Sequence, residues 1–123
     1  MTVRVLLVIA TILAGLAVAL GAFGAHGLRS IVTPERVETF ETAVRYHMWH
    51  ALALIALGIL ASVFPDLKWT LPAWLFLIGI LVFSGSLYIL VLTDTSWLGA
   101  ITPIGGTLII AGWGFLALQL WRM

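Results

Sequence analysis

The sequence lacks cysteine altogether and has very few charged residues. Asp, Glu, Lys and Arg make up only 9% of its 123 residues, and the formal net charge is +1. The absence of cysteine excludes disulfides, thiolate metal sites, iron–sulfur clusters and thiol catalysis. The small net charge excludes a basic field that would attract nucleic acid or anionic lipid.

Charge is missing from four long stretches of the chain. Residues 5–28, 46–65, 69–93 and 95–121 contain no Asp, Glu, Lys or Arg, and 63% of all residues are hydrophobic. A helix that spans a membrane needs about 20 mostly apolar residues, and every stretch is long enough for one. This distribution excludes a soluble domain, a nucleic-acid binder and a disordered tail.

The four stretches predict four membrane-spanning helices, because the bilayer core offers no water to satisfy peptide groups. The expected spans are about 5–25, 44–64, 71–92 and 98–121, within one all-α membrane domain covering 1–123. We therefore predict an integral membrane four-helix bundle. The first apolar run is longer than that of a secretory signal, so we expect this span to be retained.

The scarce charges are concentrated before the second span, where positions 29–45 hold Arg29, Glu35, Arg36, Glu38, Glu41 and Arg45. Thr33-Pro34-Glu35 is typical of a helix start, and apolar residues then recur at helical spacing. We predict a short amphipathic helix at 34–45, in which Glu41 can pair with Arg45. It either lies on the membrane interface or continues straight into the second span; a solvated turn without a partner is the alternative.

The orientation in the membrane is not decided by charge. Four spans place both termini and the 65–72 loop at one end, side A, and the two other connections at the opposite end, side B. Each side carries three basic residues, which leaves the positive-inside rule silent. Arg4 and the free amine flank the first span directly, so we expect cytoplasmic termini, with dual topology as the alternative.

Ionisable side chains within spans would be the first candidates for a function. Asp, Glu, Lys and Arg are absent from the middle of every predicted span. This argues against a proton-coupled antiporter of the small multidrug type, which relies on an intramembrane carboxylate. The chain also has no hydrolase nucleophile, H-E-x-x-H motif or phosphate-binding loop, so we predict that it is not an enzyme.

Glycines recur within the predicted spans, where small residues let helices approach closely. We interpret them as packing positions: Gly21, Gly24, Gly85, Gly105 and Gly106. Pro103 precedes two of them and is expected to bend or loosen the fourth helix, because proline removes a backbone hydrogen bond.

Three histidines lie near side B: His26 ends the first span, and His47 and His50 open the second. They could bind zinc or copper, or two of them could ligate haem. The alternative is structural, with the rings at the headgroup boundary bonded to loop carbonyls. The same half of the protein contains further polar residues, as though a small vestibule opened at side B: Ser84, Ser86, Tyr88 and Thr102.

Five ordered motifs at these positions match a known family. They are Gly21-Ala-Phe-Gly-Ala-His-Gly-Leu28, Phe40-Glu-Thr-Ala-Val44, Tyr46 with His50-Ala-Leu-Ala-Leu54, Phe83-Ser-Gly-Ser-Leu-Tyr88 and Ile101-Thr-Pro-Ile-Gly-Gly106. Through them the chain resembles domain-of-unknown-function family 423, the YwdK/YgdD-like small bacterial inner-membrane proteins. The resemblance implies a bacterial cytoplasmic-membrane protein of about four helices and supplies no activity.

The family pattern often has Gln at the position of His47, which weakens a His47/His50 metal pair. The resemblance favours another set as the polar site: His26, His50, Ser84, Ser86, Tyr88 and Thr102. Our leading hypothesis is a non-enzymatic structural or accessory protein without a cofactor, which contacts the lipid bilayer and self-associates or joins a membrane complex. The alternatives are a small-solute or ion channel or carrier and, more weakly, haem, metal or quinone binding through His26 and His50.

Overall fold

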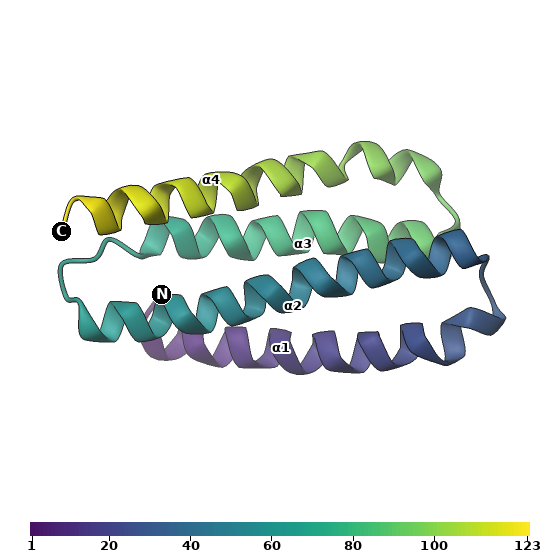
Figure 1. Cartoon of the computed structure of the whole chain (residues 1–123), viewed down its shortest axis with the longest axis horizontal. Coiled ribbons are helices and arrows are strands. Elements are labelled where there is room, and N and C mark those ends of the chain that lie inside the picture. Colours follow the sequence, from purple (N-terminus) through teal and green to yellow (C-terminus); the bar gives the residue numbers. More distant parts are fainter.

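The computed structural model describes residues 1–123 and consists of helices joined by short connections. The four long helices are α1 (Val3–Ala25), α2 (Pro34–Val63), α3 (Thr70–Thr93) and α4 (Thr102–Trp121). They run antiparallel to their neighbours, so that both termini lie at the same end (Figure 1). All four are long and apolar enough to cross a membrane, which confirms the predicted fold of four membrane-spanning helices.

The connections at side B contain two short 3₁₀ helices, η1 (Gly27–Ser30) and η2 (Ser96–Ala100). The amphipathic segment 34–45 is not a separate interfacial helix, because α2 runs without a break from Pro34 to Val63. The Thr33 hydroxyl caps its first turn by accepting a hydrogen bond from the Arg36 amide at 3.4 Å. The amphipathic segment therefore continues straight into the second span as one helix.

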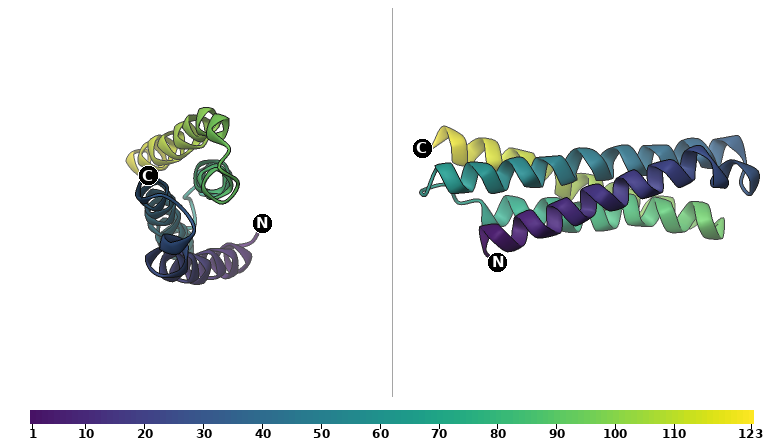
Figure 2. Two further views of the ribbon diagram at one scale, coloured as in Figure 1. Left: turned by 90° about the vertical axis from the view of Figure 1, so that its right-hand side faces the viewer. Right: turned by 90° about the horizontal axis from the view of Figure 1, so that it is seen from below.

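The helices are arranged in space in the order of the sequence. α1 packs against α2, α2 against α3, and α3 against α4. The end-on view in Figure 2 places α1 and α4 at opposite edges of the bundle. Consequently α2 and α3 are inner helices with a neighbour on each side, and α1 and α4 are outer helices.

Two apolar clusters fill the bundle, one toward each end. The cluster toward side A draws on all four helices and includes Leu6, Leu54, Phe76 and Leu116. The cluster toward side B is built mainly from α2 and α3 around Phe40. Between them lies a layer of buried polar side chains: His47, His50, Ser84, Ser86 and Thr102.

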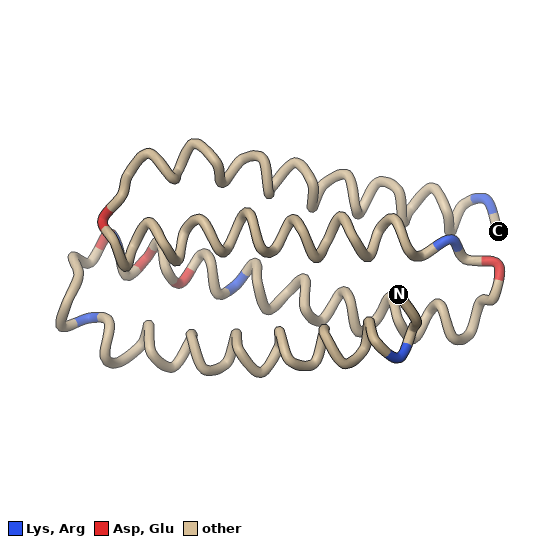
Figure 3. The backbone as a smooth tube through the Cα atoms, turned by 180° about the vertical axis from the view of Figure 1, so that it is seen from behind, with Lys and Arg blue, Asp and Glu red and all other residues tan.

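Charged residues are confined to the two ends of the bundle and the first turns of α2 (Figure 3). Two ion pairs join Glu41 to Arg29 and Arg45, both at 3.8 Å. A third joins Arg36 to Asp94, at the end of α3, at 3.0 Å. Figure 3 shows no charge along the remaining length of the four helices, as expected of segments inside lipid.

The glycines differ in what surrounds them. A Cβ added at Gly105 would collide with the backbone of Phe83, and one at Gly24 would lie 2.9 Å from the Phe40 ring. Gly21 faces Val44 at 3.3 Å, whereas Gly106 has only ordinary contacts with Phe83. A Cβ at Gly85 would meet nothing within 4 Å, so packing inside the chain does not account for this glycine.

Pro103 does not interrupt α4, contrary to the expected bend. It lies in the first turn of the helix, which begins at Thr102. Amide groups at this position have no partner within a helix, so the missing N–H breaks no hydrogen bond.

Candidate functional site

Both ring nitrogens of His50 are hydrogen-bonded, Nδ1 within α2 and Nε2 to α4. Nδ1 lies 2.8 Å from the carbonyl oxygen of Tyr46, and the indole N–H of Trp113 donates to Nε2 at 3.0 Å. A carbonyl only accepts and an indole N–H only donates, so the imidazole is neutral and carries its proton on Nδ1. Neither nitrogen has a lone pair free, and His50 in this arrangement cannot ligate a metal or a haem iron.

Aromatic packing supports this link and extends it to α3. The rings of Trp113 and Phe76 meet edge to face, with centroids 4.9 Å apart. Phe76 also lies 5.7 Å from the His50 ring and is fully buried. Edge-to-face aromatic pairs add to the stability given by burial alone, so these three residues join the inner helices to α4.

His47 links α2 to α3. Its Nδ1 lies 2.8 Å from the phenol oxygen of Tyr88. The other ring nitrogen, Nε2, is buried and has no hydrogen-bond partner. Leaving a buried polar atom unpaired costs free energy, and Nε2 of His47 is the one buried side-chain nitrogen or oxygen without a partner.

The hydroxyl groups of α3 make two further links between helices. Ser84 donates to the carbonyl oxygen of Ala43 on α2 at 2.7 Å. The hydroxyls of Ser86 and Thr102 are 2.6 Å apart, which joins α3 to α4. Small polar side chains at membrane helix contacts are expected to form such bonds.

The predicted polar site therefore does not form a single vestibule. Its members are distributed over separate contacts that hold α2, α3 and α4 together. His26 is exposed at the end of α1, away from this layer. No three His, Cys, Asp or Glu side chains lie close enough to hold a metal ion, so the predicted histidine cluster is not assembled.

Two residues of this layer were missing from the sequence-based set. Nothing in the sequence distinguishes Trp113 from the other aromatic residues of the predicted spans. Ala43 takes part only through its backbone carbonyl oxygen, which every residue has. The sequence suggests His47 as a metal ligand, whereas in the structure its hydrogen-bond partner is the phenol of Tyr88. Such partners depend on how each helix is rotated, which the sequence of a uniformly apolar span does not indicate.

Side B also presents an open groove between η1 and the start of α2, with a volume of about 470 Å³. Its lining residues are Arg29, Pro34, Val37, Glu38, Glu41 and Arg45. A smaller hollow of about 160 Å³ adjoins it and shares Glu41 and Arg45 with it. A separate hollow of about 460 Å³ lies nearby around Arg36 and Asp94, which are joined by an ion pair.

Comparison with known proteins places the chain among uncharacterised membrane proteins. The model of the family described as "Protein of unknown function (DUF423)" matches residues 20–106. The chain belongs to this family. This confirms the resemblance drawn from the five motifs.

Curated relatives cover nearly the whole chain. A UPF0382 membrane protein of Staphylococcus saprophyticus is 41% identical over 121 residues, which are 98% of this chain and 99% of the relative. The UPF0382 membrane protein YwdK of Bacillus subtilis is 46% identical over 111 residues, 89% of this chain and 90% of the relative. No solved structure matches the chain.

The family is thus a bacterial one of multi-pass membrane proteins whose function is unknown, as expected from the motifs. The names of the relatives state a membrane location and no activity.

Proposed function

We propose that the chain is a non-enzymatic accessory protein of the bacterial cytoplasmic membrane that self-associates through α1. One observation carries the proposal, a stripe of small side chains on the outward face of that helix: Thr11, Gly15, Ala19 and Ala22. All four are exposed, and a Cβ added at Gly15 would meet nothing within 4 Å. Small residues four positions apart let two membrane helices approach closely.

The stripe lies opposite the face of α1 that packs inside the chain. The inward face is formed by Leu6, Ala10, Ala17 and Gly24, all of which are buried. Since each residue turns a helix by about 100°, these positions lie about half a turn from the exposed stripe. Packing against α2 therefore leaves the stripe free for another helix.

The buried polar side chains support a structural role for the interior. His50, Ser84 and Ser86 each bond to a neighbouring helix or to its side chains. These contacts join α2, α3 and α4 to one another and support their relative positions.

The proposal includes an orientation with both termini in the cytoplasm. The two termini lie at the same end of the bundle (Figure 1). Arg4 flanks the apolar part of α1 at this end, and basic residues beside the first span favour the cytoplasmic side.

Native mass spectrometry of the protein extracted from its own membrane tests self-association. We expect an oligomer for the natural sequence and a monomer for Gly15→Leu, because a leucine would hold the two helices apart. Gly114→Leu is the matched control, since Gly114 also faces open space but lies between the large exposed side chains Ile110 and Leu118. A monomeric natural protein, or equal loss of the oligomer in both variants, would contradict the proposal.

A further inference from the structure

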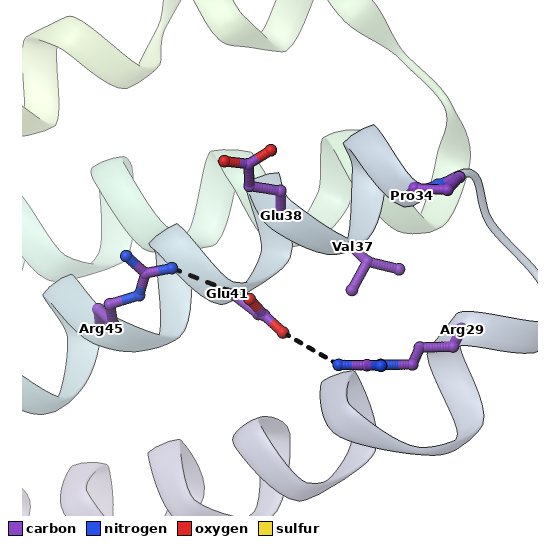
Figure 4. A pocket seen from close by; sticks show the side chains of 6 residues that line it. All are labelled: Arg29, Pro34, Val37, Glu38, Glu41 and Arg45. Carbon is purple, nitrogen blue, oxygen red and sulfur yellow. Dashed lines mark ion pairs between the residues drawn. The ribbon is translucent and has the colours of Figure 1, made fainter.

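The groove at side B continues along the contact between α1 and α2. The larger hollow is bordered by Arg29 on η1 and by the first turns of α2. The adjoining hollow reaches Gly21 and Gly24 on α1. Because Glu41 and Arg45 line both hollows, the two hollows form one continuous surface. Its charged part is formed by Arg29, Glu38, Glu41 and Arg45 (Figure 4), and its apolar part lies in the adjoining hollow.

The groove lies at the depth where lipid headgroups meet their chains. Phe40 packs against Gly24 and Val44 against Gly21, so Glu41 and Arg45 lie beside the last turn and a half of α1. The next turn of α2 carries Tyr46 and Trp49, whose side chains are exposed. Exposed Tyr and Trp residues mark the membrane–water interface, which places the charged part of the groove there.

The charges of the groove are only partly neutralised within the protein. Glu41 lies between Arg29 and Arg45, 3.8 Å from each, so these three side chains carry a net charge of +1. Glu38 has no basic side chain within ion-pair distance, and its carboxylate points away from Glu41 (Figure 4). The groove thus offers a cationic position and a separate anionic position.

This pattern is complementary to a headgroup with one phosphate and one ammonium group. We propose that the groove binds a phospholipid with a primary ammonium headgroup, of which phosphatidylethanolamine is the type. The guanidinium groups of Arg29 and Arg45 bind the phosphate, and the Glu38 carboxylate accepts hydrogen bonds from the ammonium. The apolar part of the adjoining hollow, at Gly21 and Val44, receives the start of an acyl chain.

The cationic and anionic positions of the groove favour phosphatidylethanolamine over phosphatidylcholine and phosphatidylglycerol. Guanidinium groups match phosphate oxygens with paired hydrogen bonds. The trimethylammonium of phosphatidylcholine has no N–H to donate to Glu38. The headgroup of phosphatidylglycerol has no cation, so Glu38 would face it unpaired and repel its phosphate.

The test is a lipid titration of the purified full chain, read by native mass spectrometry. Phosphatidylethanolamine, phosphatidylcholine and phosphatidylglycerol with identical acyl chains are compared, together with water-soluble glycerophosphoethanolamine. For the natural sequence we expect phosphatidylethanolamine to bind about tenfold more tightly than either other lipid, a difference of about 1.4 kcal/mol. Glycerophosphoethanolamine binds weakly, because it lacks the acyl chain that contacts the apolar part of the groove.

Three variants locate the site. Arg45→Gln weakens binding of all three lipids, whereas Glu38→Gln removes the preference for phosphatidylethanolamine over phosphatidylcholine. Glu38 makes no ion pair within the chain, so its replacement leaves the fold intact and keeps the test decisive. Arg122→Gln removes the same charge as Arg45→Gln at the opposite end and binds like the natural protein. Equal binding of the three lipids, or a preference that survives Glu38→Gln, would overturn the proposal.

Discussion

α1 and α3 are almost equally apolar, yet they hold opposite positions in the bundle. Within their most apolar stretches, 17% of residues are buried in α1 and 44% in α3. α3 packs extensively against both α2 and α4, whereas the extensive contacts of α1 with a long helix are those with α2. Hydropathy therefore determines that both helices cross the membrane but not which of them lies inside the bundle.

The difference follows from a few small and polar residues. Ser84 and Ser86 on α3 bond to neighbouring helices, and Gly79 lets Ile109 of α4 approach closely. The hydroxyl of Thr11 on α1 instead donates to carbonyl oxygens of its own helix. An inner helix needs partners on two faces, while the free face of an outer helix remains available for lipid or another protein.

The largest expected effect comes from breaking the α3–α4 contact at Gly105. Gly105→Ala places a methyl group against the backbone of Phe83, which cannot move aside as a side chain could. We expect the free energy of unfolding in detergent to fall by about 3 kcal/mol, at the upper end of typical overpacking costs. Circular dichroism during denaturation measures it. Gly85→Ala is the control and should raise stability by about 0.5–1 kcal/mol, because its methyl group meets nothing and alanine favours the helix over glycine. Equal losses in the two variants would refute the tight contact at Gly105.

A smaller effect is expected at the link between α2 and α4. Trp113→Phe removes the indole N–H that His50 accepts, and His50→Leu removes the acceptor. A double-mutant cycle with these changes should give a coupling energy of about 1 kcal/mol, the usual value of one hydrogen bond. Strictly additive losses would mean that the two side chains do not interact.

The weakest of the three effects concerns the hydroxyl pair between α3 and α4. Ser86→Ala should lower the free energy of unfolding by about 0.6 kcal/mol, the average for such bonds in membranes. Ser62→Ala is the matched control, because Ser62 donates to Gly58 within its own helix. Equal stability of the two variants would show that the Ser86–Thr102 bond adds nothing to helix association.

Much of the fold can be predicted from the sequence, because a charge-free run or a helix-start motif determines the structure of its own segment. The four long helices and the start of α2 at Pro34 are predicted in this way. The partners of His47 and His50 were not predicted, because they depend on the rotation of apolar helices about their axes. The same reason explains why Gly105 and Gly85 look alike in the sequence and differ in the structure.

The outward face of α1 is tested most directly by disulfide cross-linking in the native membrane. The chain has no cysteine, so Gly15→Cys introduces a single thiol in the middle of the small-residue stripe. Leu16→Cys is the control, because Leu16 is 50% exposed but lies about 100° around the helix from Gly15, and still further from Thr11 and Ala22. Our account predicts a disulfide-linked dimer on oxidation of Gly15→Cys and little for Leu16→Cys. Monomers in both variants, or equal cross-linking, would contradict it.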